Sequence, residues 1–233
     1  MTKKAVFLFD TTGYAAEPFT KAGVETYIID QLNVGTRATN ERASHILSWD
    51  ISCSEQRIID LAPDLLFGFP PCTDLAVSGA RHFESKRKQN PSFQEDALKL
   101  ALSVERIGRA VGCPWGWENP VSVAATMHRK PDFTFHPFEF GGWLPETDQH
   151  PEWPRYIAAQ DRYRKITNWW LSENFLRPLR KVIPCKTGWN TQTTLLGGKS
   201  LKTKMIRSAS PRGVFIALAN RYLTHWNELD EPF

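Results

Sequence analysis

The chain has 233 residues, 41% of them hydrophobic and 23% charged, which is typical of one globular domain that buries a core. Its formal net charge of +4 permits a polyanionic partner without requiring one. No apolar run approaches the roughly 18 residues that span a bilayer, and Asp10 interrupts the first apolar run too early for a signal peptide. We therefore expect a cytoplasmic protein that does not act at a membrane.

The four cysteines are widely spaced and include no C-x-x-C pair, and the six histidines are scattered. This pattern favours neither a metal site nor a disulfide framework, and it suits a reducing compartment. The cysteines are Cys53, Cys72, Cys113 and Cys185.

Short apolar runs alternate along the chain with segments of helical spacing. This alternation predicts an α/β fold with a doubly wound, mostly parallel sheet. We expect the region 128–159, which has five prolines, to be loop-rich and part of a lobe. A closing helix is expected over 208–226, with Ser210 as its N-cap before Pro211. The expected strands are 4–9, 24–30, 44–50, 64–69, 114–120 and the start of "TNWWLSE", and the expected helices are 15–23, 54–62 and 93–112.

Residues that suit a nucleoside follow the first three expected strands, and open parallel sheets bind ligands at the carboxyl ends of their strands. Gly13 permits a tight turn before a helix, although Ala15 and Pro18 exclude a dinucleotide fingerprint. Asp30 suits the hydroxyls of a ribose, and Asp50 suits an adenine amino group. Helix capping is the alternative role of such acids. Together they predict an adenosyl pocket.

A thiol and a carboxyl group follow the next two strands. Pro70 and Pro71 end the first of these strands, so Cys72 lies at its exit, and Glu118 stands at the end of the second. Cys72 is alternatively a small buried apolar side chain. As a reactive pair, the thiolate attacks an electrophilic ring carbon while the carboxyl protonates a ring nitrogen. Activation of a pyrimidine at C5 requires this combination.

The order of "FDTTGYAAEPF", Asp30, Asp50, "PPCTDLAVSG", "ENP" and "QDRYR" resembles the DNA cytosine-C5 methyltransferase family, and most closely its short members encoded by phages. The resemblance covers roughly residues 4 to 220. It implies a Rossmann-like methyltransferase fold, S-adenosylmethionine as the methyl donor, and C5 of cytosine in DNA as the acceptor. The DNA is single-stranded, or a duplex with the target base flipped out. The implied location is the cytoplasm of a bacterial or phage-infected cell.

The resemblance also implies roles for individual residues. Cys72 adds to C6 of the pyrimidine, Glu118 acts at N3, Asn119 holds the loop that carries Glu118, and Arg162 or Arg164 lies over the ring. The implied cofactor-binding residues are Phe9, Asp10, Thr12, Gly13, Asp30, Gln31, Asp50, Ile51, Pro70 and Ser210.

The chain departs from the family pattern in three places. Ala15 stands where a second glycine is usual, Thr73 replaces the usual glutamine after Cys72, and only 69 residues (233 − 164) follow Arg164. We therefore expect a catalytic domain over 1–166 and 208–233 and a small basic segment over 167–207 as a reduced target-recognition lobe. The loop after Cys72 and this segment are expected to touch DNA through Arg81, Lys86, Arg87, Lys88, Trp189 (by base stacking), Lys199, Lys202, Lys204 and Arg207.

Two alternatives remain open at this stage. The same fold and nucleophile would also suit a free pyrimidine nucleotide or a modified one-carbon donor, as the short recognition segment favours. A module that binds nucleic acid or a host protein without turnover is the other alternative, and the presence of both Cys72 and Glu118 counts against it.

Overall fold

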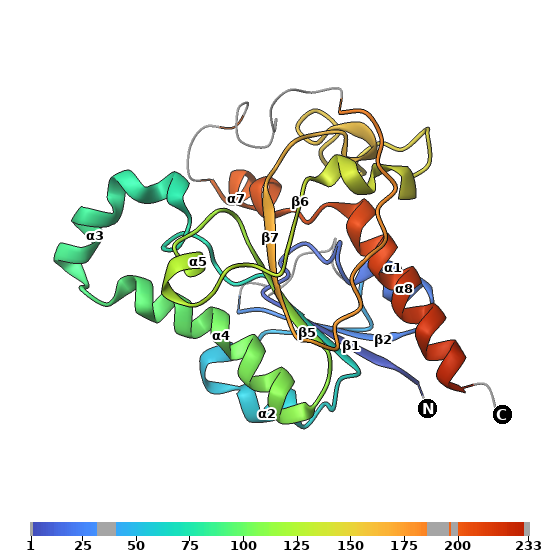
Figure 1. The fold of residues 1–233 in the computed structure, drawn as a ribbon, viewed down its shortest axis with the longest axis horizontal. Coiled ribbons are helices and arrows are strands. Elements are labelled where there is room, and N and C mark those ends of the chain that lie inside the picture. The colour runs from blue at the N-terminus through green and yellow to red at the C-terminus, as the bar shows by residue number, and fades with distance from the viewer. Residues whose placement is uncertain (1, 32–40, 186–195, 197–199, 231–233) are drawn as a thin grey trace.

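The computed structural model describes residues 2–31, 41–185, 196 and 200–230. Its strands form one seven-stranded sheet in the order β3-β2-β1-β4-β5-β7-β6 (Figure 1). The first five strands are parallel, and β7 runs antiparallel to both of its neighbours. The expected α/β fold with a mostly parallel sheet is confirmed. The strands are β1 (Lys4–Leu8), β2 (Glu25–Ile29), β3 (His45–Leu47), β4 (Leu65–Gly68), β5 (Trp115–Asn119), β6 (Phe133–Phe135) and β7 (Thr167–Leu171).

Helices cover both faces of the sheet, with α8 on one side and α4 on the other (Figure 1). The α-helices are α1 (Glu17–Lys21), α2 (Glu55–Ile59), α3 (Phe83–Gln89), α4 (Phe93–Val111), α5 (Ala124–Met127), α7 (Leu201–Ser208) and α8 (Arg212–Asp230). The short 3-10 helices are η1 (Ile51–Cys53), η2 (Val77–His82), η3 (Pro137–Trp143) and η4 (Ala159–Asp161).

The alternation of side chains along β1 divides the core into two layers. Ala5 and Phe7 belong to a cluster that includes residues of α1 and α8, and the rings of Phe7 and Phe19 lie 5.5 Å apart. Val6 and Leu8 point to the other face, into a cluster with residues of α2 and α4. Because both faces of this central strand are buried, its sequence is continuously apolar.

Helix α4 lies close to the sheet because it carries a glycine where it meets β5. A Cβ atom at Gly108 would lie 2.3 Å from Trp115 Cδ1, so a larger residue there would push the helix away. The helix ends at Gly112, whose φ of 77° is the left-handed conformation typical of a helix terminus. This packing seats α4 against the start of β5, at whose other end Glu118 and Asn119 stand.

Two parts of the chain differ from the expected organisation. The region 128–159, expected to be loop-rich, contributes β6, which forms one edge of the sheet. The basic segment 167–207 starts with β7, which lies inside the sheet between β5 and β6. A separate lobe would therefore begin only after Leu171. Among the described residues, no helix combines the length and apolar character that a membrane span needs.

Candidate active site

The order of the strands reverses where β1 and β4 lie side by side. From β1 the chain moves outward to β2 and β3 and then returns to the other side of β1 as β4. Ligands of doubly wound sheets bind beyond the carboxyl ends of the strands at such a reversal. Cys72 follows β4, Glu118 stands on β5, and the antiparallel β7 begins at this same edge.

The turn after β1 is held by its own aspartate. Phe9 has a φ of 59°, a conformation that is unusual for a residue other than glycine and that is found at functional sites. The Oδ1 atom of Asp10 accepts hydrogen bonds from the Gly13 N–H at 2.8 Å and from the Thr12 N–H and hydroxyl at 3.2 Å. Burial raises the pKa of Asp10 to about 6. Asp10, expected at the cofactor, thus also shapes the glycine turn.

Arg42 also supports this turn, and no motif in the sequence predicts that role. Its guanidinium donates to the carbonyl of Thr12 at 2.8 Å, lies 3.9 Å from the centre of the Tyr14 ring, and pairs with Glu152 at 2.5 Å. These partners are far apart in the sequence, so neither a motif nor a periodic pattern marks them. The contacts join the glycine turn to the segment before η4.

Asp30 lies next to the glycine turn. Its side chain is buried at the end of β2, and its backbone N–H donates to the carbonyl of Leu47 on β3. The negative charge of Asp30 contributes to the raised pKa of Asp10, which places the two carboxylates near each other. The structure therefore brings the first two of the predicted adenosyl-pocket residues together.

Asp50 acts as a helix cap in the structure. Its side chain is exposed and accepts from the Ser52 N–H at 3.0 Å and from the Ser52 hydroxyl at 2.6 Å, at the start of η1. These bonds and a further one from Gln31 lower the pKa of Asp50. The bond to Gln31 connects the ends of β2 and β3, and Ile51 beside it is buried. The alternative role of Asp50 as a cap is thus real, and its exposed carboxylate also remains accessible.

The charge of Glu118 acts on the thiol of Cys72. Cys72 is exposed, but the protein atoms around its thiol reduce its hydration, and this effect together with the charge of Glu118 raises the thiol pKa. Burial likewise raises the pKa of Glu118. The positive charge of Lys165 offsets part of the increase in both pKa values. A carboxyl group with a raised pKa keeps its proton to higher pH than an ordinary carboxyl group, which favours a role as an acid catalyst.

Asn119 connects the two strand ends that carry this pair. Its Nδ2 donates to the carbonyl of Pro70 at 3.4 Å, which ties the exit of β4 to the end of β5. Asn119 is buried, and its Oδ1 accepts no hydrogen bond from the described residues. A buried acceptor of this kind is uncommon, and it is available to a ligand or a bound water.

The "QDRYR" segment begins with two residues in left-handed conformations. Gln160 and Asp161 have φ values of 53° and 51°, and strain of this kind clusters at functional sites. Arg162 donates to the Oε1 atom of Gln160. Arg164 is exposed and lies 5.9 Å from the centre of the Phe138 ring. The two arginines therefore take different environments, and Arg162 is the more constrained.

Asp161 has a structural role that the motif does not reveal. Its Oδ2 atom accepts from the Gly213 N–H at 2.8 Å, in the first turn of α8. This helix starts at Arg212, later than the expected 208, so the predicted cap, Ser210, lies two positions before it and is buried. Arg212 in turn pairs with Asp148 at 2.5 Å. Sequence reasoning missed these contacts because they join distant segments.

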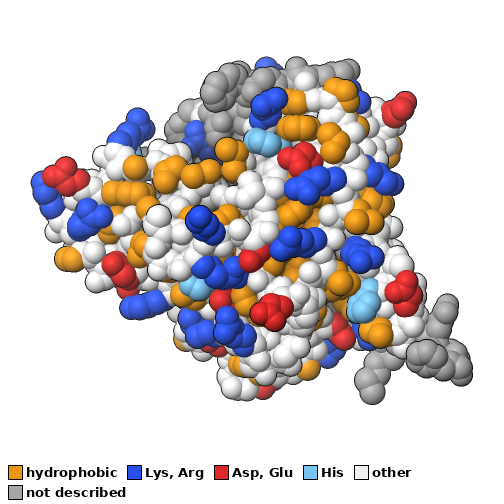
Figure 2. All heavy atoms as spheres, in the orientation of Figure 1, with side chains coloured by type: hydrophobic (Ala, Val, Ile, Leu, Met, Phe, Trp, Pro, Cys, Tyr) orange, Lys and Arg blue, Asp and Glu red, His pale blue; other side chains and the backbone are white. Residues whose placement is uncertain are grey.

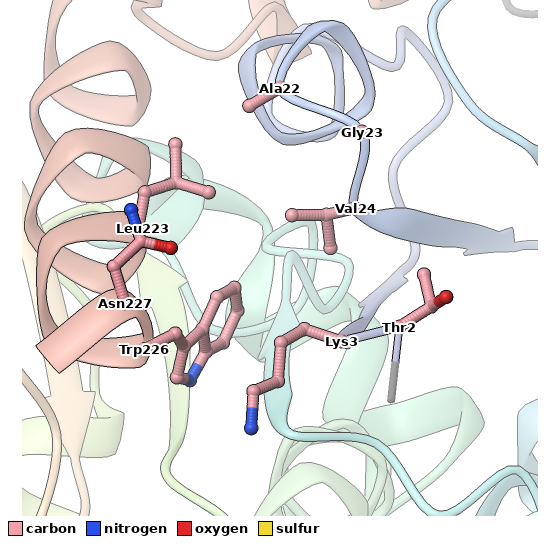
Figure 3. A pocket seen from close by; sticks show the side chains of 8 residues that line it. All are labelled: Thr2, Lys3, Ala22, Gly23, Val24, Leu223, Trp226 and Asn227. Carbon is pink, nitrogen blue, oxygen red and sulfur yellow. The ribbon is translucent and has the colours of Figure 1, made fainter. Parts of the chain in front are cut away.

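Neither of two sizeable pockets is lined by Cys72 or Glu118. A pocket of about 440 Å³ is lined by Glu146, Ala158, Ala159, Gln160 and Arg162, and so borders the arginine segment. Another, of about 480 Å³, lies near the start of β1, between Lys3, Val24 and Trp226 (Figure 3). This second pocket contains none of the predicted site residues.

The predicted phosphate contacts within the described residues lie on η2 (Arg81), α3 and α7. In Figure 1, α3 projects from the body of the molecule, and none of its side chains is buried. Figure 2 shows both basic and acidic side chains on this projection. Lys86 pairs with Asp74 and Lys88 pairs with Glu84, while Arg81 and Arg87 are also exposed. On α7, Lys202, Lys204 and Arg207 are exposed; Trp189 and Lys199 lie outside the described residues.

Among the described residues, no group of three or more His, Cys, Asp or Glu side chains is placed to hold a metal ion. Comparison with models of protein families finds no match for this chain, and neither does comparison with curated proteins.

Proposed function

We propose that this protein transfers a methyl group from S-adenosylmethionine to C5 of cytosine in DNA, through a covalent adduct with Cys72. One observation supports the proposal above all: an exposed thiol follows β4, and a carboxyl group whose burial raises its pKa stands at the end of the neighbouring parallel strand β5. The resemblance of the sequence motifs to a known family identifies the proposed reaction. The placement of the two groups at the carboxyl ends of β4 and β5, where open parallel sheets bind ligands, agrees with it.

The reaction uses each group in a defined state. The Cys72 thiolate forms a bond to C6 of the ring while Glu118 gives its proton to N3, so that C5 becomes nucleophilic. S-adenosylmethionine, when bound, supplies the methyl group as part of a sulfonium. Loss of the C5 proton to a base then expels the Cys72 thiolate, and the proton at N3 returns to Glu118. The hydrogen bond from Asn119 to Pro70 keeps the two reactive groups in register.

The acceptors at the first strand ends fit an adenosyl group. The buried carboxylate of Asp30 suits ribose hydroxyls, and the accessible carboxylate of Asp50 suits an exocyclic amino group. Phe9 and Gly13 place the backbone of the turn beside them in conformations of positive φ. We assign the turn, Asp30 and the Gln31–Asp50 contact to cofactor binding.

The distribution of exposed positive charge favours DNA as the acceptor. Exposed cations occur both on α3, soon after Cys72, and on α7, whose last turn contacts Lys165 through the carbonyl of Arg207. A mononucleotide would need neither group, whereas a phosphate chain can touch both. The pairing of Lys86 and Lys88 with acids makes α7 the stronger of the two contacts.

Analysis of nucleosides by mass spectrometry tests this proposal. After DNA is incubated with the protein and S-adenosylmethionine, digestion should yield 5-methylcytosine, and Glu118→Gln should lower the yield sharply. Methylation of free dCMP with no methylation of DNA would establish the alternative acceptor. Binding of DNA with no new nucleoside in either substrate would establish the module without turnover.

A further inference from the structure

One peptide group in the glycine turn is hydrogen-bonded on both of its sides. The N–H of Gly13 donates to Oδ1 of Asp10 at 2.8 Å. The carbonyl of Thr12, which belongs to the same peptide group, accepts from Nη1 of Arg42 at 2.8 Å. In a trans peptide the N–H and the C=O point in opposite directions, so the two bonds hold the group from opposite sides.

This peptide group would rotate easily without these bonds, because it precedes a glycine. Gly13 has a φ of 73°, and glycine adopts positive and negative φ values about equally readily. Rotation of the central peptide of a turn exchanges a positive φ for a negative one at the residue that follows. The rotated group would aim its carbonyl oxygen at the carboxyl group of Asp10, and the turn would present different atoms to a ligand beyond β1.

The guanidinium of Arg42 is itself oriented by contacts outside this peptide. Its Nη2 donates to Oε1 of Glu152 at 2.5 Å and to the hydroxyl of Tyr14 at 3.1 Å. Its Nε lies 3.7 Å from Oε2 of Glu17, at the start of α1. Only 11% of the Arg42 side chain is exposed. A largely buried guanidinium that pairs with carboxylates has little freedom to leave the carbonyl of Thr12.

Glu152 belongs to the segment that leads to η4, 110 positions after Arg42 in the sequence. The same segment packs on the residue that follows the clamped peptide. The ring of Tyr14 lies 4.9 Å from the ring of His150 and 6.1 Å from that of Trp153, and its hydroxyl donates to Glu152 at 2.9 Å. The support for Arg42 therefore comes from a packed layer of side chains.

We propose that Arg42 is a positioning residue that, together with Asp10, clamps the Thr12–Gly13 peptide in the orientation that binds S-adenosylmethionine. This inference rests on the proposed function, because that function assigns the turn to cofactor binding. Without Arg42 the peptide rotates, and only a fraction of the molecules holds the competent turn. The apparent affinity for the cofactor falls in proportion to that fraction.

Isothermal titration calorimetry with S-adenosylhomocysteine measures this effect. Arg42→Met keeps the apolar stem and removes the guanidinium, and it should weaken binding about tenfold, as the loss of a hydrogen bond to a charged group implies. Arg42→Lys keeps the charge and one donor group and should recover part of this loss. Arg221→Met removes an exposed arginine of α8 and should bind as wild type does.

Hydrogen exchange at the Gly13 amide, followed by NMR without cofactor, tests the clamp itself. The bond to Asp10 protects this amide in the wild type, and exchange reports local opening. Exchange should be faster in Arg42→Met and unchanged in Arg221→Met. The measurement does not depend on any ligand.

Wild-type affinity or a wild-type exchange rate in folded Arg42→Met would overturn the inference, and so would equal losses of affinity in the methionine and lysine variants. If Arg42→Met does not fold, Glu152→Ala replaces it, because this change removes the carboxylate that orients the guanidinium. Unchanged affinity and exchange in Glu152→Ala would then overturn the inference. Faster exchange in a protein that binds neither S-adenosylmethionine nor S-adenosylhomocysteine would keep the clamp and reject the proposed function.

Discussion

At the scale of single residues, the site is defined by carboxyl groups that the fold holds away from water. Burial raises the pKa values of Asp10 and Glu118, which lie where parallel strands end, and of Asp161 in η4. Burying a carboxylate costs free energy of folding unless hydrogen bonds compensate for it, and a group that lacks such bonds is a candidate for a functional role. Asp10 and Asp161 are hydrogen-bonded to backbone N–H groups, whereas Glu118 has the chemical role in our proposal.

The raised pKa of Asp10 predicts a pH dependence of stability with a definite sign. Between about pH 4 and pH 6 the folded protein holds a proton on Asp10 that the unfolded chain has lost, so this residue's contribution to the free energy of unfolding decreases as pH rises. Asp10→Asn keeps an oxygen that can accept from Gly13 and removes the titration. The variant should gain about 2 kcal/mol relative to wild type between pH 4.5 and pH 7 in urea unfolding. A constant difference between the two proteins would contradict this assignment.

In our proposal, Asp30 is the residue on which cofactor binding depends most directly. S-adenosylmethionine or its demethylated product should raise the melting temperature by mass action, and Asp30→Ala should abolish most of this shift. Glu41→Ala, which removes an exposed carboxylate, is the matched control and should retain the shift. Stabilisation by NAD and not by S-adenosylmethionine would refute the assignment of the pocket.

At the scale of elements, β1 to β5 and helix α4 could be predicted, because apolar periodicity and turn residues mark them. β6 could not, since its three residues between prolines are too few to show a period. Helix α3 was expected as a loop, because a helix with no buried side chain has no apolar face to detect. Residues at strand ends were predictable from topology, whereas Arg42 and Lys165 act across long sequence separations that no local pattern reveals.

Asp161 couples the motif segment to α8, so its removal should affect the element as a whole. Asp161→Ala leaves the N–H of Gly213 without its acceptor and should lower the free energy of unfolding by about 1–3 kcal/mol. Asp161→Asn, which keeps an acceptor, should cost less. Glu228→Ala, at an exposed position late in the same helix, should change stability little. Denaturant unfolding of the three variants measures this, and equal losses in the two Asp161 variants would argue against a capping role.

At the scale of the whole molecule, the cations on α3 and α7 predict how affinity for DNA depends on salt. The logarithm of the association constant falls by roughly 0.9 per logarithmic unit of salt for each phosphate neutralised. Replacing Lys202 and Lys204 by alanine should flatten the slope by about 2 units without changing any base preference. The matched control removes Lys3 and Lys21. These lysines lie near the amino-terminal ends of β1 and β2, at the opposite edge of the sheet from the proposed site, and their removal should barely alter the slope. A shallow slope in wild type would indicate a mononucleotide acceptor.

The central claim is that Cys72 forms a covalent bond to the pyrimidine, and one measurement tests it most directly. DNA containing 5-fluorocytosine, incubated with the protein and S-adenosylmethionine, should give a stable adduct, because fluorine at C5 blocks the final elimination. Peptide mapping by mass spectrometry should place that adduct on Cys72, and it should be absent from Cys72→Ser, which is expected to fold normally because the residue is exposed. Cys53→Ser, at another exposed cysteine, should form the adduct as wild type does. Methylation of DNA by Cys72→Ser, or an adduct on another residue, would contradict the account.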